Sequence, residues 1–159
     1  MRLTSWRFSI NEMYFTNLCN EFLPHAPKGY TVLISDEVAD SGIQEIENAI
    51  ASGAPKLILP MSLQVFYHMV RTSFVTGDKK RLDTFIQKAT PRENWRNLGA
   101  YKESGAAPFL DVCGVVFYHN QVPVIPVLHI KSWSRVNAKS RYFPLMNNAT
   151  ANISKTIKA

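Results

Sequence analysis

The sequence has few of the residue patterns on which enzymes and metal sites depend. It contains two cysteines, Cys19 and Cys113, which lie far apart in apolar stretches, so we expect two reduced, buried thiols and no disulfide. The four histidines form no pair at the short spacing that metal ligands usually have. The Walker A, dinucleotide-binding and G-x-S-x-G patterns are absent as well. The sequence therefore predicts no metal and no cofactor, and it disfavours nucleotide-dependent enzymes and serine hydrolases.

Long apolar runs are also absent. No stretch approaches the length of a membrane span, and the first residues lack the unbroken apolar core and small-residue cleavage site of an export signal. We therefore expect a cytoplasmic protein without membrane insertion. A length of 159 residues without a visible linker or repeat predicts one α/β domain over residues 1–159. Residues 147–159 have few apolar anchors, and we expect them to form a frayed tail.

Acidic residues are missing from the end of the chain, where Asp111 is the last one. Residues 1–70 contain four Lys or Arg and seven Asp or Glu, a net charge of −3. Residues 71–159 contain fourteen and five, a net charge of +9. Such a field attracts an anionic partner such as DNA, an acidic protein face or a membrane surface. The alternative is a charged surface that only maintains solubility.

Strand and helix patterns alternate in the first half of the chain. Residues 30–36 (YTVLISD) and 56–60 (KLILP) are apolar on both faces, which is typical of buried strands. Between them, Ser41 and Gln44 have the spacing of a capping box, and Gly53 supplies a left-handed stop. The pattern predicts a strand–helix–strand unit with two parallel strands.

The remaining patterns predict helices at the start and in the middle of the chain, followed by a hairpin. Asn11, Ser62, Asp78 and Thr90 each precede an apolar periodicity of the helical kind and can act as N-caps. The helix after Ser62 should run to about residue 76.

From residue 109 the period changes, and "FLDVCGVVFYHNQVPVIPVLHI" predicts a strand to Tyr118, a turn over residues 119–121 and a returning strand. Pro123 and Pro126 cannot donate to a ladder, so the returning strand should lie at an edge or pair on one side only. The expected class is α/β, with α+β as the alternative: a small mixed sheet, a helical middle and a C-terminal hairpin.

Two basic stretches are candidates for binding nucleic acid or another anion. In "HIKSWSRVNAKSRYF", a helix would place Lys131, Arg135 and Lys139 on one stripe, with Trp133 and Tyr142 available to stack on bases. A loop would still cluster the cations, and the alternative for Trp133 is a core anchor. In "FVTGDKKRLDTFIQKA", an acidic cap would compete with phosphate for the amides of the helix N-terminus, but the cations remain candidates. The candidate binding residues are Lys79, Lys80, Arg81, Lys131, Trp133, Arg135, Lys139 and Arg141.

A small nuclease is an alternative function. One or two histidines with a neighbouring cation can perform acid–base chemistry on a phosphodiester. His119 in the predicted turn and His129 near the end of the returning strand, followed by Lys131 and Arg135, could supply such a set. Histidines at strand ends are more often structural or solvated, so an enzymatic role is not our first hypothesis.

The segments "IQEIENAIASGAPKLILP" and "TGDKKRLDTFIQKA" resemble the ParB/sulfiredoxin-type fold, in which a helix ending in Gly precedes a Gly-x-x-Arg turn and an apolar helix. Within that fold, the chain is similar in size to plasmid fertility-inhibition factors, which block conjugative DNA transfer at the type IV secretion coupling step. The resemblance implies a cytoplasmic interaction factor whose partner is DNA or an acidic face of a conjugation coupling protein. A protein-binding adaptor or a DNA-binding regulator is a further alternative.

Overall fold

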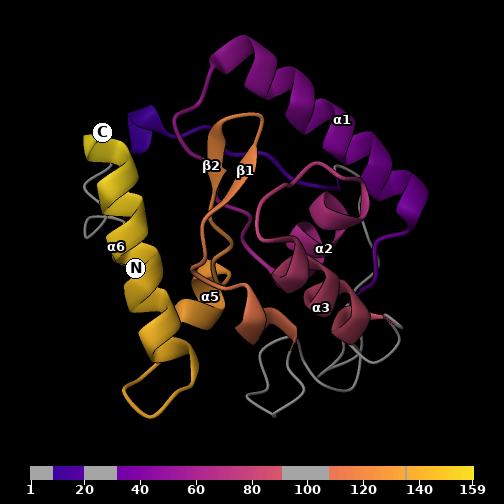
Figure 1. The fold of residues 1–159 in the computed structure, drawn as a ribbon. Helices are drawn as coiled ribbons and strands as arrows, with labels where there is room; N and C mark the ends of the chain where they lie inside the picture. Colours follow the sequence, from indigo (N-terminus) through magenta and orange to yellow (C-terminus); the bar gives the residue numbers. More distant parts are fainter. Residues whose placement is uncertain (1–8, 20–31, 91–107, 135) are drawn as a thin grey trace.

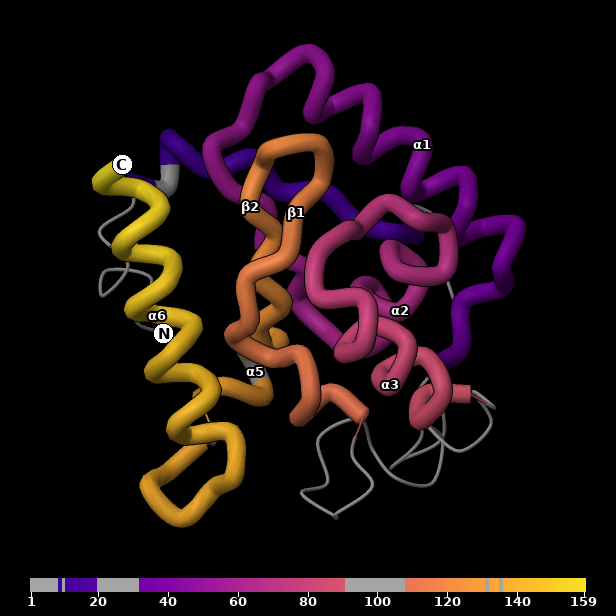
Figure 2. Tube along the Cα trace, viewed as in Figure 1, coloured from indigo at the N-terminus to yellow at the C-terminus, as the bar shows by residue number. Residues whose placement is uncertain are grey.

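A computed structural model describes residues 9–19, 32–90, 108–134 and 136–159 (Figure 1). It has a central two-stranded hairpin with α6 on one side and α1, α2 and α3 on the other, an arrangement that the chain trace shows most clearly (Figure 2). The helices are α1 (Asp36–Gly53), α2 (Leu63–Arg71), α3 (Lys79–Ala89), α5 (Ile130–Trp133) and α6 (Tyr142–Lys158). The strands are β1 (Phe117–His119) and β2 (Val122–Val124), and the short 3-10 segments are η2 (Ile10–Glu12) and η3 (Pro108–Asp111). The mixed α/β class is confirmed.

The hairpin forms around a two-residue turn. β1 and β2 pair antiparallel, with Phe117 opposite Val124 and His119 opposite Val122. Asn120 and Gln121 connect them with φ values of 49° and 72°. Positive φ at both central residues is the geometry whose twist matches antiparallel strands. The predicted turn over residues 119–121 is therefore correct, although both strands are shorter than predicted.

Two further segments extend the hairpin into a small mixed sheet. Thr76 pairs antiparallel with Tyr118, while Ile58 pairs parallel with Val124 on the other side. β2 thus has neighbours on both sides, and the prediction that it lies at an edge is wrong. Pro123 causes no gap because Ile58 donates to the Pro123 carbonyl (2.9 Å) and accepts from the N–H of Ile125 (3.0 Å), so the proline nitrogen is not needed.

The predicted strand–helix–strand unit is present in outline, but its strands are not regular. Residues 32–35 form no strand, and the segment 56–60 contributes only the isolated bridge at Ile58. In the place of a neighbouring strand, a side chain forms hydrogen bonds with main-chain groups of residues 32–34. The Gln64 carboxamide accepts from the N–H of Ile34 (2.8 Å) and donates to the carbonyl of Val32 (3.1 Å).

Helix α1 begins five residues before the predicted cap at Ser41. Ser35 is the N-cap, since its hydroxyl accepts from the N–H of Val38 (3.3 Å). Ser41 is an exposed position inside the helix, and the left-handed residue at the end is Ala54 (φ 42°), not Gly53. The buried face of the helix consists of Ala39, Gly42, Ile43 and Ile46.

The caps predicted for the next two helices are confirmed. Ser62 accepts from the N–H of Val65 (3.2 Å), and Asp78 accepts from the N–H of Arg81 (3.0 Å). Helix α2 ends at Arg71, about five residues earlier than predicted, because the segment after it packs in the core and pairs with the sheet. Phe74 and Val75 are buried there, and Thr76 pairs with β1.

The sequence predicts three further regular segments: helices after Asn11 and Thr90, and a strand from residue 109. The helix predicted after Asn11 is wrong, because η2 ends at Glu12 and the residues that follow, 13–19, are irregular. The helix predicted after Thr90 lies outside the described residues. The early part of the strand predicted from residue 109 is instead η3 and a turn.

The C-terminal region is a helix, so the prediction of a frayed tail over residues 147–159 is wrong. Tyr142, Met146, Ala149 and Ile153 share one face of α6 and are all buried. Gly114 lets the helix approach closely: a Cβ on it would lie 2.3 Å from the carbonyl oxygen of Leu145. This region is thus an integral part of the core.

Candidate nucleic-acid interface

The cations at the start of α3 are largely held by neighbouring oxygens. Lys79 pairs with Asp83 (Nζ–Oδ2 2.6 Å). Arg81 lies 3.5 Å from the carboxylate of Asp78 and donates to the main-chain carbonyl of Asp111 (2.8 Å). Lys80 is exposed and has no carboxylate partner among the described residues. Of the three predicted residues, only Lys80 lacks an ion pair with a carboxylate in the part of the chain that the structure describes.

The last acidic residue of the chain is also engaged by α3. Asp111 accepts an ion pair from Lys88 (Nζ–Oδ2 2.7 Å), which joins η3 to the end of α3. Among the described residues, Asp111 forms no ion pair with Lys139, Arg141, Lys155 or Lys158, so it does not compensate these cations of the C-terminal region.

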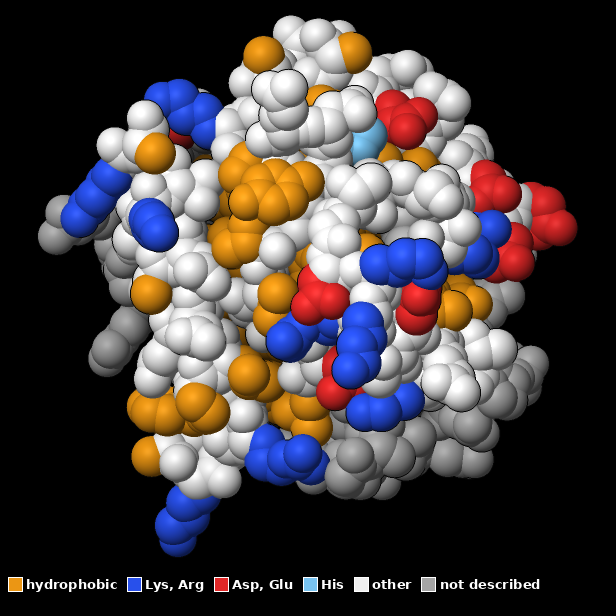
Figure 3. All heavy atoms as spheres, viewed as in Figure 1, with side chains coloured by type: hydrophobic (Ala, Val, Ile, Leu, Met, Phe, Trp, Pro, Cys, Tyr) orange, Lys and Arg blue, Asp and Glu red, His pale blue; other side chains and the backbone are white. Residues whose placement is uncertain are grey.

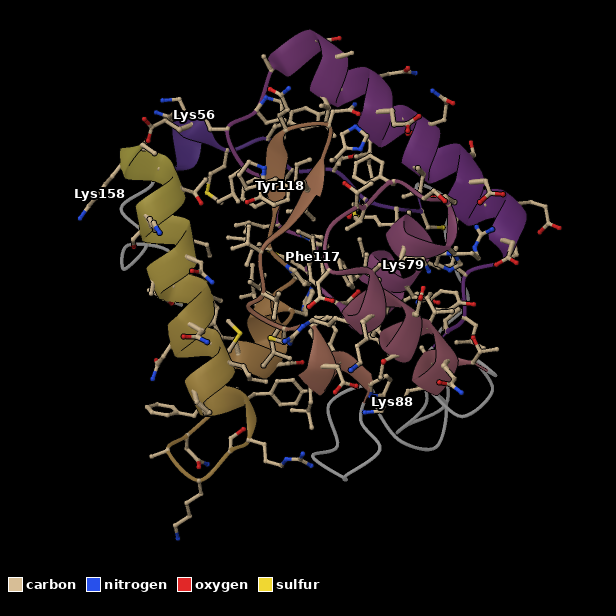
Figure 4. All side chains as sticks on the ribbon, in the orientation of Figure 1. Lys56, Lys79, Lys88, Phe117, Tyr118 and Lys158 are labelled. Atoms are coloured by element: carbon tan, nitrogen blue, oxygen red, sulfur yellow. The ribbon has the colours of Figure 1, made fainter. Side chains whose placement is uncertain are left out.

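Several lysines in and near α6 are exposed. Among the described residues, no carboxylate forms an ion pair with Lys139, Lys155 or Lys158, and the same is true of Lys56. Figure 4 shows Lys56 and Lys158 on the same side of the molecule, at the C-terminal end of α6. Lys56, Lys155 and Lys158 were not predicted as binding residues. Lys155 and Lys158 were assigned to the frayed tail, and Lys56 comes from the acidic half of the sequence.

The predicted stripe of cations after residue 130 does not form. Helix α5 ends at Trp133, and Lys139 lies in a turn six residues further on. Lys131 belongs to α5, Arg135 lies outside the described residues, and Arg141 is exposed immediately before α6. The described residues Lys131, Lys139 and Arg141 therefore have no common helical face, and the described part of the segment between Trp133 and α6 is a loop.

The aromatic residues available for stacking are not the predicted ones. Trp133 is half-buried and packs against the hydrophobic core, and Tyr142 is only 2% exposed. By contrast, Tyr118 on β1 is 45% exposed and Phe143 on α6 is 40% exposed. The alternation of the hairpin strand, with Phe117 buried and Tyr118 exposed, is the sequence signal that could have identified Tyr118.

Tyr118 lies between two groups of cations. Figure 3 shows hydrophobic side chains between α6 and the α3 region, with Lys and Arg side chains on both sides. Figure 4 places Tyr118 between Lys158 on one side and Lys79 on the other. We call Lys56, Tyr118, Lys155 and Lys158, together with Lys79 and Lys80 at the start of α3, the Tyr118 face.

The two histidines of the nuclease alternative are not brought together. His119 is at the hairpin turn, where its Nδ1 lies 2.8 Å from the carbonyl oxygen of Phe74 and its ring stacks on that of Phe74 at 3.8 Å. His129 is exposed just before α5, beyond the other end of β2. The contacts of His119 fix the hairpin turn against the segment after α2, which is a structural role.

A charged cluster that the sequence patterns did not indicate joins α1 to α2. His68 is fully buried, and its Nδ1 accepts from Nε of Arg71 (3.3 Å). The same guanidinium pairs with Asp40 and lies 3.6 Å from the carboxylate of Asp36. Because Arg71 contacts groups of both helices, the cluster fixes α1 against the rest of the protein.

The two cysteines differ in burial: Cys113 is buried as predicted, whereas Cys19 is only half-buried. Burial raises the pKa of the Cys113 thiol to about 12, against the opposing effect of a backbone hydrogen bond with Leu128. The thiol is therefore protonated and unreactive near neutral pH. No group of three or more metal-ligating side chains occurs among the described residues, and none of their helices is long and apolar enough to cross a membrane.

Comparisons with known proteins identify no relative. No protein-family model matches the chain, and searches of curated proteins and of solved structures found no similar protein. A functional argument must therefore start from the Tyr118 face and the charges around it.

Proposed function

We propose that the protein is an interaction factor that binds nucleic acid through the Tyr118 face. The observation that supports this proposal is the contrast among its lysines. Lys79 and Lys88 are paired with carboxylates, whereas Lys56, Lys155 and Lys158 are exposed without such partners among the described residues. Uncompensated cations create the positive potential that attracts a polyanion and releases its counterions on binding.

The distribution of acidic residues supports the same surface. The sequence of α1 contains Asp36, Glu37, Asp40, Glu45 and Glu47 and no Lys or Arg. Figure 3 shows one group of acidic side chains on the side where α1 lies and others among the cations over the α3 region, where they are paired. A phosphate backbone would be repelled by α1 and attracted by α6, so it would approach in one orientation. A charged surface that served solubility alone would not require this separation.

The proposed setting is conjugative DNA transfer in the cytoplasm, where the protein would inhibit transfer at the type IV secretion coupling complex by binding its DNA. This part of the proposal is supported by the sequence resemblance to fertility-inhibition factors. Its test is to express the protein in donor cells that carry a second conjugative plasmid. Fewer transconjugants are expected, and an unchanged number would contradict the setting.

The binding proposal is tested by measuring affinity for a DNA duplex of arbitrary sequence between about 50 and 200 mM salt. Several phosphate contacts should weaken binding by about 10²-fold or more over this range. The double variant Lys155→Glu/Lys158→Glu should bind more weakly and with a shallower salt dependence. The control Lys88→Glu reverses the charge of a lysine that is paired with Asp111 and lies outside the Tyr118 face, and it should have a smaller effect. Absence of binding at 50 mM salt would refute the proposal.

The same variants separate nucleic-acid binding from a purely protein-binding adaptor. If the protein inhibits transfer by binding DNA, Lys155→Glu/Lys158→Glu should restore transconjugants as it lowers DNA affinity. Inhibition that persists after DNA binding is lost would instead assign the function to a protein contact.

A further inference from the structure

We propose that Tyr118 is a base-stacking residue and that the Tyr118 face consequently prefers single-stranded to double-stranded nucleic acid. The inference rests on the proposed function and adds the class of nucleic acid to it. It depends on three properties of Tyr118: its exposure, the rigidity of its main chain and its position between cations.

The tyrosine ring is exposed because the pairing of β1 directs it away from the core. Phe117 is fully buried and lies 5.3 Å from the ring of Phe66, and His119 stacks on Phe74. Side chains alternate along a strand, so Tyr118 between them must point to the opposite face. It is 45% exposed there, which leaves a ring surface available to a base.

The main chain of Tyr118 is fixed by hydrogen bonds on the side of β1 that does not face β2. Its N–H donates to the carbonyl of Thr76 (2.8 Å), and its carbonyl accepts from the N–H of Thr76 (2.7 Å). The hydroxyl of Thr76 donates to the same carbonyl (3.2 Å). A stacking residue on such a scaffold loses little conformational freedom when it binds, which favours affinity.

The cations around the ring suit a strand whose bases are accessible. Lys158 and Lys56 lie on one side of Tyr118 and Lys79 on the other (Figure 4). Lys79 is paired with Asp83, but Lys80, next to it in the first turn of α3, has no carboxylate partner among the described residues, so phosphates on either side of a stacked base would meet positive charge. Stacking requires an exposed base face, which a single strand offers and an intact duplex hides between base pairs. Lysines alone would bind both forms, so the preference should depend on Tyr118.

The experiment compares the affinities of the full chain for a fluorescently labelled oligothymidine and for a duplex of the same length. Wild type should bind the single strand more tightly. Alanine substitution of a residue that stacks on one base lowers the affinity roughly 5- to 150-fold. Tyr118→Ala should therefore weaken single-strand binding by at least about fivefold. The same variant should leave duplex affinity within about twofold, and Tyr118→Phe should restore single-strand binding.

Phe143 provides the matched control, because it is exposed to a similar extent at the other end of α6. Phe143→Ala should bind the single strand like wild type. Equal wild-type affinity for the two nucleic acids, or an unchanged affinity of Tyr118→Ala, would overturn the inference while leaving the proposed function in place. If neither nucleic acid binds at low salt, it is the proposed function that fails.

Discussion

Helices α1 and α6 are nearly equal in length, at 18 and 17 residues, and each buries one apolar face, but they differ in charge and in how they are attached. α1 contains acidic residues and no cation, whereas α6 contains Lys155 and Lys158 and no acidic residue. α1 has a side-chain cap at Ser35, and the N-cap residue of α6, Arg141, provides none.

The attachment of the two helices shows where charge has a structural role. α1 is joined to α2 through the ion pair of Asp40 with Arg71. α6 is held by buried apolar side chains, by the close approach at Gly114 and by a hydrogen bond from Asn152 to the Gly114 carbonyl (2.9 Å). The lysines of α6 take part in none of these contacts. Their charge is therefore available to the nucleic acid that we propose as the partner.

Substitution at Gly114 should have the largest effect on this comparison. Gly114→Ala would place a Cβ against the Leu145 carbonyl at a residue whose φ is +78°. We expect a loss of about 3 kcal/mol or more in the free energy of unfolding, measured by urea denaturation. Gly53→Ala is the control, because a Cβ there meets nothing within 4 Å, and it should be neutral or slightly stabilising. Wild-type stability of Gly114→Ala would mean that α6 does not pack as described.

Alkaline pH should weaken the attachment of α6 through Cys113, whose sulfur lies 3.7 Å from that of Met146. The pKa of the buried thiol is raised from 9.0 to about 12, so its stabilisation is complete below pH 9 and is lost as pH rises toward about 12. The free energy of unfolding should fall by about 1.4 kcal/mol per pH unit from this group. The pH dependence of Cys113→Ala should be shallower than that of wild type by this amount, and identical curves would contradict the prediction.

Breaking the attachment of α1 should have a smaller effect. Arg71→Met leaves Asp40 without its partner and removes the donor to the fully buried His68. We expect a loss of about 1–2 kcal/mol, since the carboxylates are partly exposed and screened by solvent. Lys79→Met, which removes the exposed pair with Asp83, should cost less than about 0.5 kcal/mol. Equal effects of the two variants in thermal unfolding would show that the cluster does not hold α1.

The smallest effect is expected from reversing a charge on α1. Glu47→Lys changes the net charge of the protein by +2 on α1, which lies on the other side of the hairpin from α6 (Figure 1). Salt screens the interaction between exposed charges that are separated by more than about 8 Å. The affinity of this variant for DNA at about 150 mM salt should stay within roughly twofold of wild type. A gain as large as the loss in Lys155→Glu/Lys158→Glu, measured by fluorescence anisotropy, would show that net charge alone determines binding.

Local signals were read correctly from the sequence because their physical cause is local. The caps at Ser62 and Asp78 are hydrogen bonds to an N–H three residues away, and the hairpin turn depends on two residues. Ser35 and Ser41 both precede an apolar periodicity of the helical kind, so either could be the N-cap of α1. Packing of the helix against the rest of the chain determines that Ser35 is the cap. The irregular strands likewise depend on partners distant in sequence.

The binding face could be predicted only in part. The clustering of cations in the sequence indicates Lys79 and Lys80 as binding residues. It does not show that Lys79 pairs with Asp83, because that ion pair depends on the side-chain geometry of the helix. Lys155 and Lys158 were assigned to a tail because "NNATANISKTIKA" has weak helix formers and widely spaced apolar residues. The buried face that orders this segment needs the partner surface at Gly114 and Cys113, which no local pattern reveals.

Gln64 has a consequence for the behaviour of the protein at high concentration. Its carboxamide occupies the main-chain donor of Ile34 and the acceptor of Val32. Unpaired main-chain groups on an apolar extended segment are a template for strands of other molecules and hence for aggregation. One side chain therefore occupies main-chain groups that could otherwise pair with another molecule, and it does so without the length of chain that a covering strand would require.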